Sequence, residues 1–89
     1  MRARIEAISY YLPPGTLTND ELVKRFPDLK IDDLTRLTGV TERHIAEKGQ
    51  TSADLACEAA EKLFSEHKIN REEIDFILYN TQWRDYITP

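Results

Sequence analysis

The sequence predicts an α/β fold that is incomplete on its own, and three features indicate it. Residues 2–12 (RARIEAISYYL) alternate in polarity, residues 75–81 (DFILYNT) form an apolar run of strand formers, and a long helix is expected between them. A strand, a crossover helix and a second strand predict a parallel pair with a right-handed connection. Two strands do not complete an α/β sheet, so residues 1–89 are expected to form part of one larger domain.

The first half of the chain predicts one strand and two short helices. Pro13, Pro14 and Gly15 should end the strand at residues 2–12, because proline cannot continue a ladder. The run LTNDELVKRF predicts a helix that Thr18 or Asn19 caps and Pro27 stops. The run KIDDLTRLTG predicts a second helix, with Gly39 in the left-handed position after its end.

The second half contains the clearest helix signal. Residues 40–47 (VTERHIAE) are predicted to be extended or irregular. The run TSADLACEAAEKLFSEH then predicts a long helix capped by Thr51, with Asp54 three residues later near the free backbone amides. Alanines give this helix a narrow face that permits close packing. Asn70 is predicted to cap a single helical turn before the strand at residues 75–81.

Composition and charge exclude several classes of protein. Twelve Lys and Arg against sixteen Asp and Glu give a net charge of −4, which argues against nucleic acid as the main partner. No apolar run approaches the ~20 residues that span a bilayer, and residues 1–15 have no secretory h-region. A single cysteine fits a reducing cytoplasm and excludes an internal disulfide.

The residue types that carry chemistry do not form a complete site. Cys57 lies inside the long helix with Glu58 beside it, so we interpret it as a half-buried structural cysteine rather than a nucleophile. His44 and His67 are too few for a metal site and are interpreted as structural or solvated. We therefore predict no catalytic residue, no metal ligand and no cofactor within the chain.

Two positions remain candidates for binding. Arg43 follows a tight turn, and its guanidinium suits either an anionic ligand or, as the favoured use, a structural ion pair. Residues 83–86 (Trp-Arg-Asp-Tyr) follow the end of a predicted strand, where open α/β sheets place ligands; Trp83 could equally cover a core or a subunit interface.

Three runs of the sequence together resemble the β-ketoacyl-acyl-carrier-protein synthase III family. They are ISYYLPPGTLTNDEL, LTGVTERHIAEKGQTSADLACEAAEKL and EEIDFILYNTQWRDYITP, and they occur in the family's order from about Ile5 to Pro89. The resemblance implies that residues 1–89 are the N-terminal part of a thiolase-like domain, a mixed sheet with packed helices. It also implies a homodimeric, cytoplasmic acyltransferase that condenses an acyl-CoA primer with malonyl-acyl-carrier protein in fatty acid biosynthesis.

The resemblance places the family's catalytic cysteine, histidine and asparagine after the position of Pro89. The chain is therefore expected to be an N-terminal fragment that is inactive alone. Members of the family contact CoA through a tryptophan and an arginine that match Asp33 and Leu37 here. Arg36 lies beside the second position, so Arg36 and Arg43 are the candidate contacts to CoA or another anion. Two alternatives stay open: a stand-alone interaction domain, and a relative of the family in secondary metabolism.

Overall fold

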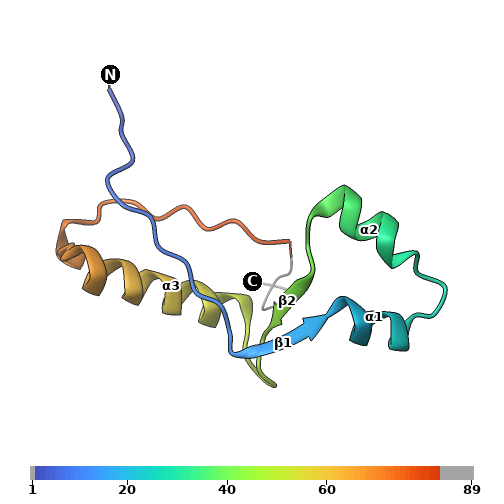
Figure 1. Cartoon of the computed structure of the whole chain (residues 1–89). Helices are drawn as coiled ribbons and strands as arrows, with labels where there is room; N and C mark the ends of the chain where they lie inside the picture. The colour runs from blue at the N-terminus through green and yellow to red at the C-terminus, as the bar shows by residue number, and fades with distance from the viewer. Residues whose placement is uncertain (1, 83–89) are drawn as a thin grey trace. The chain divides into compact units, whose positions relative to one another are not determined.

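The computed structural model describes residues 2–82, and the chain divides into two compact units (Figure 1). One unit is Leu12–Glu47, and the other, which we call the α3 unit, joins residues 2–11 to residues 48–82. The elements in chain order are β1 (Gly15–Thr18), α1 (Asn19–Arg25), α2 (Ile31–Thr38), β2 (Glu42–Ile45), α3 (Ser52–His67) and the single 3₁₀ turn η1 (Arg71–Glu73).

The Leu12–Glu47 unit consists of a two-stranded antiparallel sheet and two short helices. β1 pairs with β2 so that Gly15 lies opposite Ile45 and Thr18 opposite Glu42. The side chain of Thr18 caps α1 by accepting a hydrogen bond from the backbone N–H of Glu21 at 3.2 Å. Both helices therefore begin and end close to the predicted positions.

Glycine ends α2 as predicted. Gly39 has a φ of 71°, in the left-handed region that an L side chain rarely adopts, and its N–H donates to the carbonyl of Thr35 at 2.7 Å. The chain can thus reverse after α2 and return toward β1 as β2.

The α3 unit is organised around its long helix. Thr51 and Asp54 form a reciprocal capping box at the start of α3: each side chain accepts from the other residue's N–H, at 3.1 and 3.0 Å. At the other end, Asn70 caps η1 by accepting from the N–H of Glu72 at 3.0 Å. The capping predictions for Thr51 and Asn70 are confirmed.

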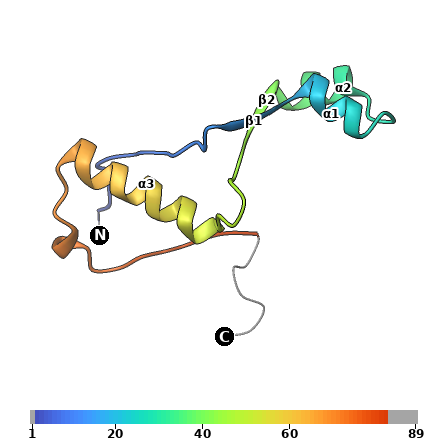
Figure 2. The same cartoon turned by 90° about the horizontal axis from the view of Figure 1, so that it is seen from below.

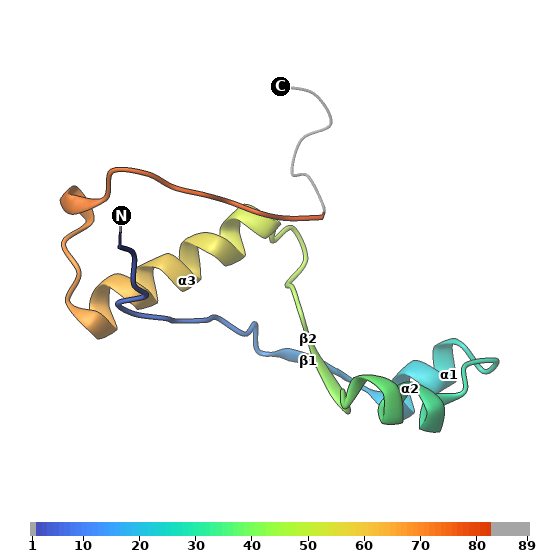
Figure 3. The same cartoon turned by 90° about the horizontal axis from the view of Figure 1, so that it is seen from above.

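The two predicted strands at residues 2–12 and 75–81 are wrong as paired strands. Within residues 2–82, sheet pairing is confined to β1 and β2, and β1 begins at Gly15, the last residue of the turn that was expected to end the first strand. Both segments are extended and run in the same direction along α3 (Figures 1 and 3), but no ladder joins them. Residues 40–47, which were predicted to be extended or irregular, contain β2, so the extended alternative is the one that the structure shows.

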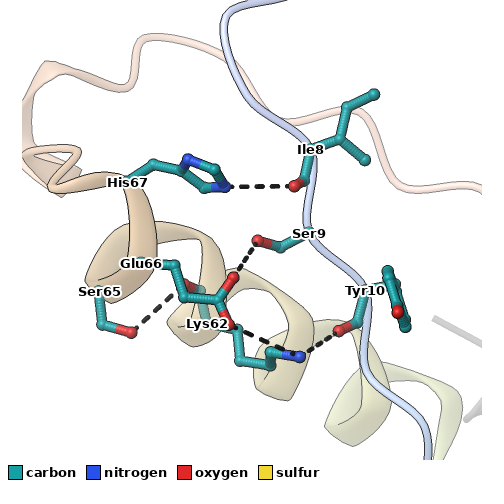
Figure 4. Close-up of polar contacts among 7 residues, drawn as sticks. All are labelled: Ile8, Ser9, Tyr10, Lys62, Ser65, Glu66 and His67. Atoms are coloured by element: carbon teal, nitrogen blue, oxygen red, sulfur yellow. Dashed lines mark hydrogen bonds and ion pairs between the residues drawn. The ribbon is translucent and has the colours of Figure 1, made fainter.

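Polar contacts hold the first of these segments on α3 (Figure 4). Lys62 Nζ donates to the carbonyl of Tyr10 at 2.9 Å, and Ser9 Oγ donates to Glu66 Oε2 at 3.1 Å. His67 Nε2 is 3.3 Å from the carbonyl oxygen of Ile8. Three successive residues of the segment thus contact the last two turns of α3, and these contacts do not require a sheet.

Apolar side chains of the α3 unit remain uncovered. Apart from Pro13, no residue within 2–82 is buried, and Ile5, Ile77 and Leu78 are 80%, 80% and 86% exposed. The unpaired segments carry much of this surface, because strand residues with apolar side chains on both faces need a neighbour on each side. The view from below (Figure 2) shows the two segments running on either side of α3.

Replacing the cap of α3 tests how far the helix depends on its local signals. We expect Thr51→Ala to destabilise α3 by about 1 kcal/mol, because the backbone N–H of Asp54 loses its acceptor. The melting of the circular dichroism signal at 222 nm measures this, with Thr51→Ser as the matched control that retains the hydroxyl. Equal melting of Thr51→Ala and the unsubstituted chain would contradict the capping assignment.

Candidate functional site

Arg36 lies on the last turn of α2 and is open to solvent. Its side chain is 74% exposed, and Nη2 donates to Asp33 Oδ1 at 3.2 Å. Exposed ion pairs of this kind contribute about 0–1 kcal/mol, so the contact is readily exchanged for another anion. The structure thus places the charge of Arg36 at the surface and pairs it with Asp33.

Arg43 has a different partner from the one that the sequence favoured. It lies on β2, is half-buried, and donates from Nη1 to Asn19 Oδ1 at 2.9 Å. No ion pair of Arg43 occurs within residues 2–82. The expected structural ion pair is therefore wrong for the described chain: a neutral amide holds this guanidinium.

Asn19 is the residue that sequence reasoning missed. Its Nδ2 donates to Thr35 Oγ1 at 2.8 Å and to the carbonyl of Val40 at 3.0 Å, while its Oδ1 accepts from Arg43. The signal was present, because Thr18 and Asn19 are adjacent residues that both suit a helix cap. Only Thr18 caps α1, which leaves the Asn19 amide for other contacts.

Both histidines bond to backbone carbonyl oxygens. His44 Nδ1 lies 2.6 Å from the oxygen of Pro13, and His67 Nε2 contacts Ile8 as described above. A carbonyl only accepts, so each of these ring nitrogens carries the proton. These contacts agree with the structural interpretation of His44 and His67. Within residues 2–82, no group of three or more His, Cys, Asp or Glu is arranged to hold a metal ion.

Cys57 differs from its expected burial. The thiol is exposed and lines an apolar cavity of about 260 Å³ between α3 and the extended segment that follows η1. The other lining residues are Ala53, Ala56, Ala60, Ile77 and Tyr79. The predicted small-residue face of α3 is thus real, but the segment covers it incompletely, and Cys57 stays open instead of half-buried.

One ion pair shifts the pKa values of its partners. Arg71 donates to both carboxylate oxygens of Glu61, at 3.0 and 2.7 Å, and its guanidinium lies 5.0 Å from the ring centroid of Phe64. These hydrogen bonds, and secondarily the charge of Arg71, lower the pKa of Glu61 and raise the pKa of Arg71. The pair ties η1 to the end of α3, so we interpret it as structural.

The remaining candidates lie outside the described residues. Trp83, Arg84, Asp85 and Tyr86 are beyond residue 82, and their expected place near a ligand stays a prediction. Among the helices of residues 2–82, none has the length and apolar character that crossing a bilayer requires. The structure brings Arg43 together with Asn19, whereas Arg36 pairs separately with Asp33 on α2.

Comparison with known proteins gives a consistent result over nearly the whole chain. No protein-family model matches. A β-ketoacyl-acyl-carrier-protein synthase III of Koribacter versatilis is 36% identical over 88 residues, which cover 99% of this chain and 26% of the relative. The enzyme of the same name from Xylella fastidiosa strain 9a5c is 38% identical over 87 residues, 98% of this chain and 26% of the relative.

A solved structure agrees with these relatives. The crystal structure of a 3-oxoacyl-(acyl-carrier-protein) synthase III superposes with a TM-score of 0.79 and 41% identity, over 96% of this chain and 25% of that one. The fold is therefore part of a thiolase-like α/β domain, as predicted. The chain belongs to the β-ketoacyl-acyl-carrier-protein synthase III family and corresponds to its N-terminal segment. It spans about a quarter of the length of the curated relatives that it matches.

The Glu61–Arg71 pair predicts a pH dependence. Because the folded-state pKa of Glu61 is lowered, the pair stabilises the chain above the carboxyl's ordinary pKa, and this contribution is lost as the pH falls through the folded value. We expect Glu61→Gln to reduce the difference between thermal melts at pH 7 and pH 3. Glu58→Gln, on the same helix, is the matched control. The same pH dependence in both variants would contradict the assignment.

Proposed function

We propose that this chain forms part of a β-ketoacyl-acyl-carrier-protein synthase III. Such an acyltransferase condenses an acyl-CoA primer with malonyl-acyl-carrier protein in fatty acid biosynthesis. The observation that carries the proposal is the joint agreement of sequence and structure: relatives at 36–38% identity and a solved structure at TM-score 0.79 all bear this activity in their names. Residues 1–89 would then belong to one thiolase-like domain, to which both units contribute.

In this proposal the chain supplies framework and binding groups rather than the reacting groups. The one cysteine, Cys57, lies in the second turn of α3 and away from the helix start, where a thiolate would be stabilised. His44 and His67 are committed to backbone carbonyls. We therefore predict that residues 1–89 alone do not condense substrates.

Arg36 and Arg43 are the proposed contacts to the acyl-CoA substrate. Phosphate groups bind guanidinium well, because its planar array of donors matches their oxygens. Arg36 would exchange its exposed contact with Asp33 for a phosphate, at little cost. Arg43 already carries a charge that no carboxylate of the described chain neutralises.

Partners and location follow from the same proposal. The complete enzyme would bind acyl-CoA and the acyl-carrier protein as substrates. It is expected to be a homodimer and to be located in the cytoplasm. Each of these remains a prediction for this chain.

Two specific observations keep the alternatives in view. The exposed Ile5, Ile77 and Leu78 favour a stand-alone interaction domain that pairs through its unpaired extended segments. Asp33 and Leu37, at positions where the family contacts CoA, favour a relative in secondary metabolism that takes its acyl group from another carrier.

The activity of the polypeptide made from the natural gene distinguishes the synthase from the two alternatives. We expect it to decarboxylate malonyl-acyl-carrier protein and to form a ketoacyl product, while residues 1–89 alone form none. Mass spectrometry of the acyl-carrier protein measures the product. A natural gene product without condensing activity that binds another protein instead would favour the interaction domain.

Arg36 gives a residue-level test in the active polypeptide. We expect Arg36→Ala to raise the KM for acyl-CoA about tenfold and to leave kcat nearly unchanged, because a phosphate contact binds ground state and transition state alike. Arg25→Ala, an exposed arginine at the end of α1, is the matched control. Equal KM values for both variants would remove Arg36 from the site.

A further inference from the structure

Residues 8–10 turn their polar side chain toward α3 and leave their apolar side chains outside. Ser9 is half-buried and its Oγ donates to Glu66 Oε2 at 3.1 Å, whereas Ile8 and Tyr10 are 72% and 68% exposed. Figure 4 shows Ser9 directed at Glu66 and the Ile8 side chain directed away from the helix. Burial of apolar surface alone would favour the opposite arrangement, with Ile8 and Tyr10 against α3. Contacts other than apolar burial therefore determine this orientation.

The side chains that hold Ser9 and Tyr10 form a closed network. Lys62 Nζ donates to the carbonyl of Tyr10 at 2.9 Å, lies 5.2 Å from the centroid of the Tyr10 ring, and lies 3.7 Å from Glu66 Oε1. Glu66 uses its other carboxylate oxygen to accept from Ser9. Each contact in such a ring orients the groups that make the next one, so the members are expected to support one another.

The backbone carbonyls that bind α3 lie on one edge of the segment. His67 Nε2 bonds to the carbonyl oxygen of Ile8 at 3.3 Å, and Lys62 bonds to that of Tyr10, two residues further along. In an extended chain successive carbonyls point to opposite edges, so these two point to the same edge. A shift of one residue would present the opposite edge to α3 and turn the Ser9 hydroxyl away from the helix. The contacts thus fit a single register.

We propose that Lys62, Glu66 and His67 form a polar clasp that sets the register of residues 8–10 on α3 without a β-ladder. The clasp binds two carbonyls and the Ser9 hydroxyl, and it makes no use of the backbone N–H groups of the segment. It is a conformational device: it keeps outward the apolar side chains that burial alone would turn toward the helix. This role does not depend on the activity of the natural gene product.

Disulfide trapping in the 89-residue chain measures the register directly. In a Cys57→Ser background, the in-register pair carries Ser9→Cys and Glu66→Cys, and the shifted pair carries Ile8→Cys and Glu66→Cys. Both pairs replace the Ser9–Glu66 contact, so the rest of the clasp holds the segment in each. The rate of disulfide formation in oxidised glutathione, followed by mass spectrometry, reports how often the two thiols meet.

We expect the in-register pair to close about threefold to fivefold faster than the shifted pair, the effect of one exposed charged contact. Lys62→Met should slow the in-register pair by a similar factor, because the carbonyl of Tyr10 loses its donor, whereas Lys62→Arg keeps a donor and the rate. Lys68→Met is the matched control, since it removes the same charge from a side chain without a hydrogen bond or ion pair to the described residues. Lys and Met have similar helix propensities, and circular dichroism at 222 nm checks that α3 is retained.

The outcomes separate the register from the residues that set it. Equal rates for the in-register and shifted pairs would overturn the proposed register. A rate that Lys62→Met leaves unchanged, or that Lys68→Met slows equally, would overturn the clasp, because the effect would then be absent or would belong to net charge. Faster closure of the in-register pair that depends on Lys62 and not on Lys68 is the result that the clasp predicts.

Discussion

The uncovered apolar surface of the α3 unit is the constraint on which the rest of the structure depends. Folding must bury enough apolar area to offset the lost conformational entropy, and a chain of this size has little margin. Here residues 2–11 and 75–81 follow α3 in extended form and leave many of their apolar side chains exposed. What places the first segment is instead a set of exposed polar contacts from Lys62, Glu66 and His67, each worth little alone. Extended segments with apolar side chains on both faces need a neighbour on each side. The chain spans about a quarter of the length of its curated relatives.

The Leu12–Glu47 unit meets the same constraint in another way. It has no buried apolar core either, but a network of hydrogen bonds around Asn19 gives it a defined local geometry. Polar networks specify one arrangement more than they add stability, because water competes for each bond. This suits a unit whose proposed task is to hold two arginines at a ligand rather than to fill a core.

The sequence predicted the helices well, because their signals are local. Thr51 and Asn70 act within three residues of themselves, and Gly39 takes the left-handed conformation that its own backbone permits. Residues 2–12 and 75–81 were wrongly predicted to pair, because the polarity pattern of a segment does not show which other segment it pairs with. For the same reason the partner of Arg43 was missed: Asn19 lies 24 residues away along the chain, and only the antiparallel register of β1 and β2 brings the two together. The exposure of Cys57 was missed because it depends on how completely residues 75–81 cover α3.

Hydrogen exchange of residues 3–11 and 75–80 tests most directly the claim that these segments are strands awaiting neighbours. The measurement compares residues 1–89 alone with the polypeptide purified from the natural gene, using mass spectrometry of overlapping peptides. We expect near-random-coil rates for both segments in residues 1–89 alone, where no backbone ladder protects them, and strong protection in the natural gene product. Equal rates in the two samples, or full protection in residues 1–89 alone, would contradict this account of the fold.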